Sequence, residues 1–147
     1  MAIREDCDVA LLPIKPHFAS AIIDGSKRVE FRRQAFARPI SHILIYASSP
    51  VQRVVGYFRI AKIRRDAPAA IWETYHDVGG ISAEEFVAYY DGADAAVAIE
   101  VRDLVVLDRP ISLCTIKRRL RAPQNYTYLS AAVLRRLRKR RHKPQPN

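Results

Sequence analysis

Cysteine, glycine and long apolar runs are all scarce in this 147-residue sequence. Its two cysteines, Cys7 and Cys114, match no metal-binding or redox spacing, so we expect free thiols in a reducing compartment. No stretch approaches the roughly 18 apolar residues of a membrane helix. Acids precede the short first apolar run, which Pro13 breaks, and this does not fit a secretory signal. We therefore expect a cytoplasmic protein without a membrane segment.

Motifs for metals and phosphate-binding loops are also missing. The four histidines never stand three or four residues apart, and the two cysteines do not join them. Neither a glycine-rich phosphate loop nor a G-x-S-x-G elbow occurs. We therefore expect no metal and no other cofactor. What the sequence does have is a composition that is 49% hydrophobic and 27% charged, which is typical of a globular protein with one core.

Positive charge is abundant, but it is confined to one end of the chain. There are 25 Lys and Arg residues against 15 Asp and Glu residues, a net charge of +10. Residues 117–147 hold eleven bases and no acid, which leaves 14 bases and 15 acids, a net charge of −1, in residues 1–116. Such a block attracts polyanions through their phosphates, although a solubilising tail has the same composition.

This charge distribution predicts two parts, a domain at residues 1–129 and a basic C-terminal extension at residues 130–147. Ser130 is expected to cap a basic amphipathic helix in the extension. We expect Arg135, Arg138 and Arg141 to contact nucleic acid from there. RNA is the favoured partner, with DNA or an acidic protein as alternatives, and insertion into a membrane is disfavoured because the helix has few apolar anchors.

Strand-like segments outnumber helical ones in the domain. Gly56, inside the longest of them, marks a bulge or a close approach of another backbone, and Asp103 marks a kink or a break in the last. No βαβ rhythm persists, so a parallel sheet is disfavoured. We expect an α+β fold, a small and mostly antiparallel β-barrel with short helices and a basic C-terminal helix or tail. The expected strands are residues 8–15, 27–33, 42–49, 53–63 and 95–108.

The helices are indicated by their first residues. Pro16 and Pro68 suit the first turn of a helix, and Ser82 with Glu85 forms a capping box for a third helix. Aromatic residues recur at helical spacing in the second and third helices, and core packing is the favoured interpretation of them over a ligand cage. These aromatic residues are Trp72, Tyr75, Phe86, Tyr89 and Tyr90.

The segment from Gly25 to Arg32 carries the most chemistry. A glycine turn delivers Lys27 to the start of a strand, and Glu30 and Arg32 then project from the same face. An ammonium, a carboxylate and a planar guanidinium together suit binding of a polar or phosphate-bearing ligand. Desolvation would lower the pKa of Lys27 and allow it to act as a base. The alternative is a surface ion pair beside a solvated lysine, worth about 0–1 kcal/mol.

Several segments, in this order, resemble the ASCH family (activating-signal-cointegrator homology). They are Ile14-Lys15-Pro16, the segment from Gly25 to Arg32, the run from Ile45 to Pro50, Val54-Val55-Gly56, the helix from Ile81 to Phe86, the strand from Ala98 to Val101, and Pro123-Gln124-Asn125-Tyr126. The likeness covers roughly residues 9–129. The G-x-K-x-x-E-x-R string is a loose pattern by itself, so the ordered set carries the resemblance.

The resemblance implies a PUA-like β-barrel that binds RNA in a cleft beside the barrel, lined by the lysine of the G-x-K segment. Some members of the family are ribonucleases, and a bacterial branch hydrolyses N4-acetylcytidine with a lysine, a threonine three residues later and a glutamate before the later helix. Lys27 matches that lysine. Glu30 stands at the threonine position, and Gly79 and Gly80 stand near the glutamate position, with Asp77 as the nearest acid.

The same resemblance suggests which residues form the site. Lys15, Lys27, Glu30 and Arg32 are expected in the cleft, with Lys27 and Glu30 as the catalytic candidates. Phosphate contacts are expected from Arg28 and Arg33, hydroxyl and backbone contacts from Tyr46, Ser48 and Ser49, and base contacts from Gln124 and Tyr126. A glutamine amide reads a base edge and a tyrosine ring stacks on a base, although Tyr126 also fits a role as a packed wall residue.

Three functional hypotheses follow. The first is an ASCH-type RNA-binding protein, regulatory in role, with a nucleotide-binding cleft and a basic extension that adds nonspecific affinity. The second is a metal-independent hydrolase, either a ribonuclease or an N4-acetylcytidine amidohydrolase, that uses Lys27 with Glu30. The third is an interaction module whose basic helix docks an acidic protein. No sequence feature indicates an oligomeric state.

Overall fold

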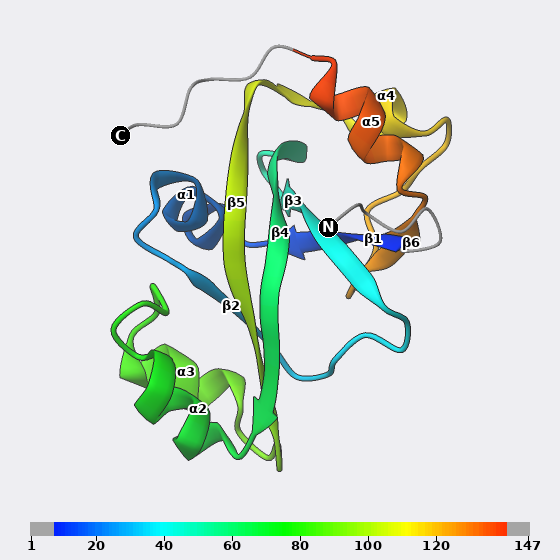
Figure 1. The fold of residues 1–147 in the computed structure, drawn as a ribbon. Helices are drawn as coiled ribbons and strands as arrows, with labels where there is room; N and C mark the ends of the chain where they lie inside the picture. Colours follow the sequence, from blue (N-terminus) through cyan, green and yellow to red (C-terminus); the bar gives the residue numbers. More distant parts are fainter. Residues whose placement is uncertain (1–7, 141–147) are drawn as a thin grey trace.

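The computed structural model describes residues 8–140 as a mixed sheet of six strands with five helices packed around it (Figure 1). The sheet order is β2-β5-β4-β3-β1-β6. In chain order the elements are β1 (Asp8–Ile14), α1 (Pro16–Asp24), β2 (Val29–Arg32), β3 (Ile40–Ala47), β4 (Arg53–Asp66), α2 (Pro68–Tyr75), α3 (Ala83–Tyr89), β5 (Ala96–Ile111), α4 (Leu113–Ile116), β6 (Thr127–Leu129) and α5 (Ala132–Arg138).

The sheet is open rather than closed, so the expected barrel is not what the described residues form. Within residues 8–140, β2 pairs only with β5 and β6 pairs only with β1, which leaves two edges. The pair of β1 and β3 is parallel, while the other pairs are antiparallel. A parallel pair needs a long crossover, and the segment between these strands, which contains α1 and β2, provides it.

Gly56 lies where the backbones of β4 and β5 approach each other closely. The β4–β5 register shifts between Val54 and Gly56, and a Cβ on Gly56 would stand 2.6 Å from the Val105 carbonyl oxygen and 2.9 Å from Ile23 Cδ1. The predicted bulge and close approach are therefore both confirmed. The predicted irregularity at Asp103 is a kink in one continuous strand, since this residue has a φ of 50° inside β5.

Both faces of the sheet are covered, as the apolar run in β3 predicts. Ile43 and Ile45 pack on the side of α1, and Leu44 and Tyr46 pack on the side of α4 and α5. A third cluster, built from β2, α2, α3 and the start of β5, holds Tyr75, Phe86 and Tyr90, with Trp72 against it. Four of the five predicted packing aromatics thus lie in or against the core, and Tyr89 is 38% exposed.

The helix α5 belongs to this core. Its residues Val133, Leu134 and Leu137 are at most 8% exposed and pack in the cluster formed by β1, β3 and β4. Ser130 Oγ accepts a hydrogen bond from Ala132 N at 3.2 Å, although the helix itself begins one residue later than Ser130 would place it. Burial of each such side chain contributes about 1.5–3 kcal/mol, so residues 130–140 stabilise the domain, and the division after residue 129 stays a prediction.

The described helices are short. Within residues 8–140, none has the length and apolarity required to cross a membrane. The predicted cap at Ser82 is confirmed, because Ser82 Oγ accepts a hydrogen bond from Glu85 N at 3.1 Å, and the same hydroxyl donates to Glu85 Oε1 at 3.3 Å. These two bonds fix the start of α3 and therefore the direction in which its first turn presents Glu85.

Replacement of Gly56 by alanine tests the close approach of β4 and β5. We expect Gly56→Ala to lower the free energy of unfolding in urea by roughly 2–3 kcal/mol, because the added methyl meets a backbone carbonyl that cannot move without disrupting the strand pairing. Gly92→Ala is the control: it has a φ of 76° and nothing within 4 Å of the new Cβ, so only backbone strain of about 1 kcal/mol is expected. An equal loss in both variants would contradict the close approach.

Candidate functional site

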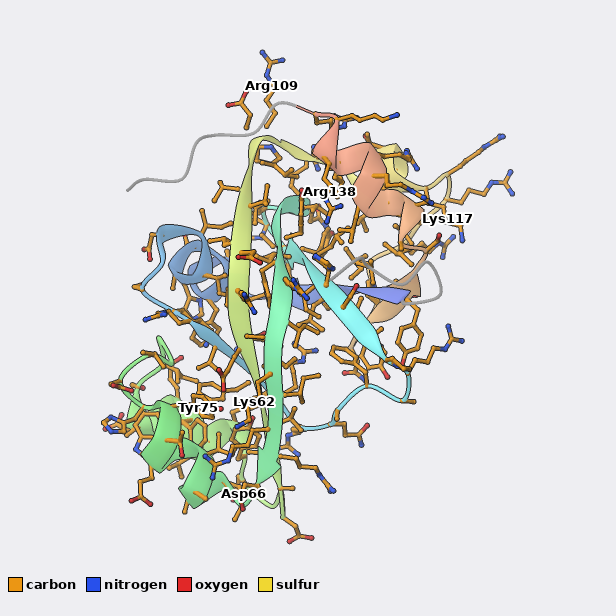
Figure 2. All side chains as sticks on the ribbon, in the orientation of Figure 1. Lys62, Asp66, Tyr75, Arg109, Lys117 and Arg138 are labelled. Atoms are coloured by element: carbon orange, nitrogen blue, oxygen red, sulfur yellow. The ribbon has the colours of Figure 1, made fainter. Side chains whose placement is uncertain are left out.

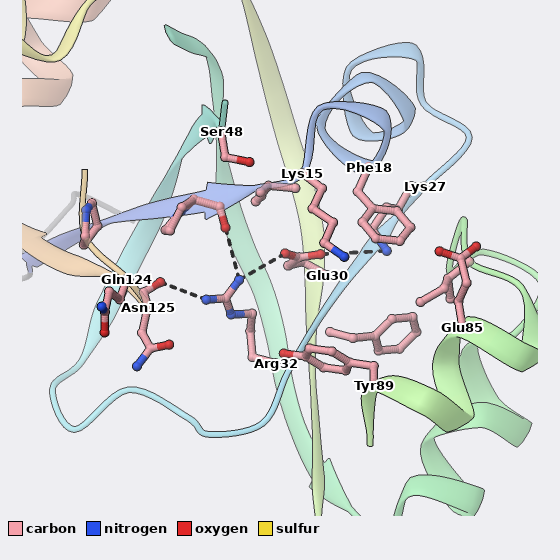
Figure 3. Close-up of a pocket in the computed structure, with 15 residues that line it drawn as sticks. Lys15, Phe18, Lys27, Glu30, Arg32, Ser48, Glu85, Tyr89, Gln124 and Asn125 are labelled. Carbon is pink, nitrogen blue, oxygen red and sulfur yellow. Dashed lines mark hydrogen bonds and ion pairs between the residues drawn. The ribbon is translucent and has the colours of Figure 1, made fainter. Parts of the chain in front are cut away.

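A cavity of about 470 Å³ opens where the end of β1, the start of α1, β2 and α3 meet the loop before β6 (Figure 3). Its volume is in the range of small-molecule sites. Polar and aromatic side chains from distant parts of the sequence share it. The lining residues are Pro13, Ile14, Lys15, Phe18, Lys27, Glu30, Phe31, Arg32, Ser48, Ile81, Glu85, Tyr89, Pro123, Gln124 and Asn125.

Lys27 lies at the bottom of this cavity with only 2% of its surface exposed. Gly25 ends α1 in the left-handed conformation, with a φ of 88°, and Lys27 N then donates to Ala21 O at 3.0 Å. This tight turn directs the side chain inward. Its Nζ donates to the Gly79 carbonyl oxygen and stands 5.1 Å and 4.9 Å from the ring centroids of Phe18 and Phe31. The alternative of a solvated lysine is therefore wrong.

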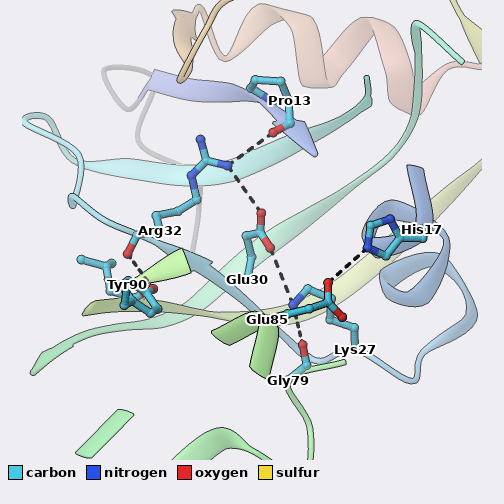
Figure 4. A network of polar contacts seen from close by, with 9 residues as sticks. Pro13, His17, Lys27, Glu30, Arg32, Gly79, Glu85 and Tyr90 are labelled. Atoms are coloured by element: carbon cyan, nitrogen blue, oxygen red, sulfur yellow. Dashed lines mark hydrogen bonds and ion pairs between the residues drawn. The ribbon is translucent and has the colours of Figure 1, made fainter. Parts of the chain in front are cut away.

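Glu30 links Lys27 to Arg32 in a chain of charges (Figure 4). Lys27 Nζ is 3.8 Å from Glu30 Oε1, and Arg32 Nη1 is 3.6 Å from Glu30 Oε2. Arg32 also donates from Nη1 to Pro13 O at 3.3 Å and from Nη2 to Asn125 O at 2.8 Å. The guanidinium is thus held between two walls of the cavity, and the carboxylate stands between two cations.

Burial changes the acid–base properties of this chain of charges. Desolvation lowers the pKa of Lys27, and the negative charges of Glu30 and, more weakly, Glu85 oppose the shift. Desolvation likewise raises the pKa of Glu30, against the attraction of Lys27 and Arg32. Both shifts favour neutral forms because an ion loses its hydration when it is buried. A lysine of lowered pKa and a carboxyl of raised pKa, side by side, can exchange protons with a ligand.

Glu85 is a site residue that the sequence did not reveal. It lines the cavity, its charge acts on Lys27, and its Oε2 lies 3.9 Å from His17 Nε2 at the mouth. The predicted capping box accounts for Glu85 without any ligand, and nothing in the sequence indicates that the first turn of α3 lies near α1. Asp77, the nearest acid to the two glycines, is not among the lining residues.

The glycines at 79 and 80 have a structural role above Lys27. Gly79 supplies the carbonyl that accepts from Nζ, and a Cβ on Gly80 would stand 2.7 Å from Lys27 Cβ. Gly80 also has a φ of 59°, a conformation that side chains rarely adopt. A Cβ on Gly79 would stand 2.8 Å from Phe31 Cε2, so the loop before α3 lies against Lys27 because Gly80 lacks a side chain and against Phe31 because Gly79 does.

Three further predicted residues lie at the cavity. Lys15 and Ser48 follow β1 and β3, and the parallel pairing of these strands, with Ser48 N donating to Ile14 O at 2.9 Å, puts both at the same edge. Gln124 lines the opposite wall with its neighbour Asn125, facing Phe18 and Glu85 across the cavity (Figure 3). The sequence predicts these residues at the site, but it does not predict the parallel pairing of β1 and β3 that places Lys15 and Ser48 side by side.

Other predicted residues lie away from the cavity lining. Arg33 donates to the backbone oxygens of Tyr89 and Asp91. Arg28 is exposed just before β2, and Ser49 is exposed in the turn after β3. Tyr46 is 4% exposed and packs in the core. Tyr126 packs edge-on against Phe36, with 4.9 Å between ring centroids, which fits the wall-residue alternative.

Of the residues predicted in the C-terminal extension, the two that the structure describes, Arg135 and Arg138, are not among the residues that line the cavity. Arg135 and Arg138 are exposed on α5, and Arg141 lies outside the described residues. Cys114 is an exposed free thiol, and Cys7 also lies outside the described residues. Residues 8–140 contain no group of three or more His, Cys, Asp or Glu side chains that could hold a metal ion.

Comparisons with known proteins match most of the chain. A family model described as a domain of unknown function (DUF365) matches residues 9–126. An ASCH domain-containing ribonuclease from Zymomonas mobilis is 33% identical over 124 residues, which are 82% of this chain and 83% of the relative. The large ribosomal subunit protein uL22 of Ureaplasma parvum is 27% identical over 86% of this chain, but only 40% of that protein is covered.

Solved structures agree with these sequence matches. The crystal structure of ASCH from Zymomonas mobilis has a TM-score of 0.79 with 32% identity, and the match covers 88% of this chain and 92% of that one. The YTH domain of Zygosaccharomyces rouxii MRB1, solved in complex with N6-methyladenosine RNA, has a TM-score of 0.50 over 95% of this chain and 89% of that one. At 13% identity this second likeness concerns the fold alone. From the coverage and identity of the Zymomonas mobilis relative, and from the fold they share, this chain belongs to the ASCH domain family.

Proposed function

We propose that this protein binds RNA and that one nucleotide enters the cavity around Lys27. The observation that carries the proposal is the buried Lys27–Glu30–Arg32 chain, held in place by backbone carbonyls at the bottom of an open cavity. Such a fixed set of donors and an acceptor recognises a polar ligand without rearrangement. A single-stranded nucleotide supplies a base edge, a ribose and a phosphate to match it.

The lining offers a contact for each part of a nucleotide. The Gln124 and Asn125 side chains can hydrogen-bond to a base edge, and the exposed ring of Tyr89 can stack on a base. Lys15, which is exposed beside Ser48, can pair with a phosphate at the mouth. The cations Lys15, Lys27 and Arg32 outnumber the acids Glu30 and Glu85 by one, so the site attracts an anion overall.

RNA cleavage is the second candidate, favoured by the 33% identical relative named a ribonuclease and by the lowered pKa of Lys27. In its neutral form Lys27 can accept the proton of a ribose 2′-OH while Nζ still donates to Gly79 O. The 2′-oxygen then forms a bond to phosphorus and the bond from phosphorus to the 5′-oxygen breaks. The Glu30 carboxyl, whose pKa burial raises, supplies in its protonated form the proton of the leaving hydroxyl, so that a 2′,3′-cyclic phosphate and a 5′-OH result.

Substitution of Lys27 tests both candidates. We expect Lys27→Met to weaken binding of a short labelled single-stranded RNA by about tenfold, since a charge-assisted hydrogen bond is lost. Any cleavage should fall by roughly 10²- to 10⁴-fold, the usual contribution of a general base. Fluorescence anisotropy measures the binding, and gel assays of labelled RNA measure the cleavage. Hydrolysis of N4-acetylcytidine is assayed in parallel for the amidohydrolase alternative.

Arg65→Met is the matched control for this variant, because Arg65 is an exposed cation on β4 outside the cavity lining. Both variants are first compared in urea unfolding, since Lys27→Met leaves the Glu30 carboxylate buried with one cation fewer. Equal RNA binding by folded wild type and folded Lys27→Met would refute the role of the cavity. Binding with no cleavage by the wild type would retain the first candidate and refute the second.

The direction of the Lys27 titration is a further prediction. In ¹³C NMR, the Cε signal of Lys27 should titrate with a midpoint below the ordinary 10.5 of a lysine. Glu30→Gln should move this midpoint lower still, because the carboxylate charge raises the pKa of Lys27. Glu85→Gln should move it in the same direction but less, and Glu73→Gln, exposed on α2 and outside the lining, should not move it. An upward movement in Glu30→Gln would show that desolvation and charge do not act on Lys27 in this way.

A further inference from the structure

The bases of the C-terminal end fall into two groups in the structure. One group lies on α5 and just after it: Arg135, Arg136, Arg138, Lys139 and Arg140. The other, here named the basic loop, lies between α4 and β6: Lys117, Arg118, Arg119 and Arg121. No acid lies among them from residue 109 to residue 140. The two groups differ in what their side chains contact.

The arginines of the α5 group are used to hold the protein together. Arg136 donates to Ile116 O at 2.7 Å and to Thr115 O at 3.0 Å, which ties α5 to α4. Arg138 interacts with the Tyr57 phenol, where its positive charge opposes the rise in the pKa of Tyr57 that burial causes. Arg138 is labelled in Figure 2. Arg135 and Arg140 also have interaction partners within the protein. The charges of Arg136 and Arg138 are therefore already engaged within the protein.

Unlike the arginines Arg136 and Arg138, the basic side chains of the basic loop have no interaction partner among the described residues. All four are exposed, and within residues 8–140 none has a side-chain hydrogen bond, ion pair or ring contact. The loop backbone is nevertheless anchored, because Leu120 packs against the core and its N donates to Lys117 O at 3.0 Å. Lys117 lies beside α5 at the end of the molecule opposite α2 and α3 (Figure 2). The loop therefore presents unpaired cations from a defined position.

This loop leads directly into the cavity wall. Two residues after Arg121 the chain reaches Pro123, so the Cα of Arg121 lies within about 7 Å of the Pro123 Cα. Pro123, Gln124 and Asn125 all line the cavity, and Arg32 Nη2 donates a hydrogen bond to the Asn125 carbonyl oxygen at 2.8 Å. The basic loop is therefore the segment of the chain that adjoins this wall of the cavity.

We propose that the basic loop binds the phosphates of the RNA nucleotides next to the one in the cavity, and that the α5 arginines serve mainly to stabilise the fold. This inference rests on the proposed RNA binding. The bound RNA would run from the cavity along the basic loop, and its phosphates would contact Lys117, Arg118 and Arg121. Cations with no partner in the protein can pair with phosphates without first breaking an internal contact, and each pair releases counterions.

The test compares two variants of equal charge. The loop variant is Lys117→Gln/Arg118→Gln/Arg121→Gln, and the control variant is Lys62→Gln/Arg65→Gln/Arg109→Gln, three exposed cations elsewhere. Arg119 is left unchanged because its φ is 64°. Affinity for a short single-stranded RNA is measured against salt concentration, with urea unfolding as the check that both variants fold. A mononucleotide is measured in parallel, because it can occupy the cavity alone.

In the loop variant we expect RNA affinity to fall by about tenfold or more at low salt and the slope of log K against log salt to become shallower by about 2. Mononucleotide affinity should stay unchanged, and the control variant should lose less than about threefold of its RNA affinity. Equal losses in both variants, or none in the loop variant, would overturn the inference while leaving RNA binding in place. No RNA binding by the wild type, or competition by polyglutamate as strong as by RNA, would overturn it together with the proposed function.

Discussion

Burial of one ammonium group is the constraint on which the cavity depends. Removing the charge of Lys27 from water costs several kcal/mol unless donors and acceptors replace the lost hydration. The Gly79 carbonyl, the Glu30 carboxylate and two phenylalanine rings supply that replacement. If the loop at 79–80 moved away, the ammonium would lose its hydrogen-bond acceptor while remaining between the rings. The position of the loop before α3 and the charge of Lys27 are therefore mutually dependent.

The same constraint extends across the molecule through Arg32. This guanidinium faces Glu30 and donates to the carbonyls of Pro13 and Asn125. Together with Gly79, three separate segments meet the Lys27–Glu30–Arg32 chain through backbone oxygens. A backbone acceptor needs no particular side chain, so its position depends only on the path of the chain. The geometry of the site is thus determined by the fold around it, and a change in any of these segments should alter the electrostatics of all three charges.

This reliance on backbone explains what sequence analysis could and could not predict. The strands, the cap at Ser82 and the close approach at Gly56 follow from local patterns, and so did the choice of the segment from Gly25 to Arg32. The parallel pairing of β1 and β3 was missed because it joins strands separated by a long crossover, and the open sheet was missed with it. Glu85 was missed because its local role in the cap already accounted for it. In each failure the missing information was a long-range contact.

The net charge of +10 also needs the fold for its interpretation. From sequence, all bases of the C-terminal end are equivalent, and a helix rich in arginine is the natural candidate for binding a polyanion. In the structure, Arg136 and Arg138 use their guanidinium groups on Ile116, Thr115 and Tyr57. A charge already paired within the protein has less to gain from a phosphate, because the internal contact must first be given up. Affinity for RNA should therefore depend on which cations lack partners rather than on their total number, whereas selectivity should depend on the nearly neutral cavity around Lys27.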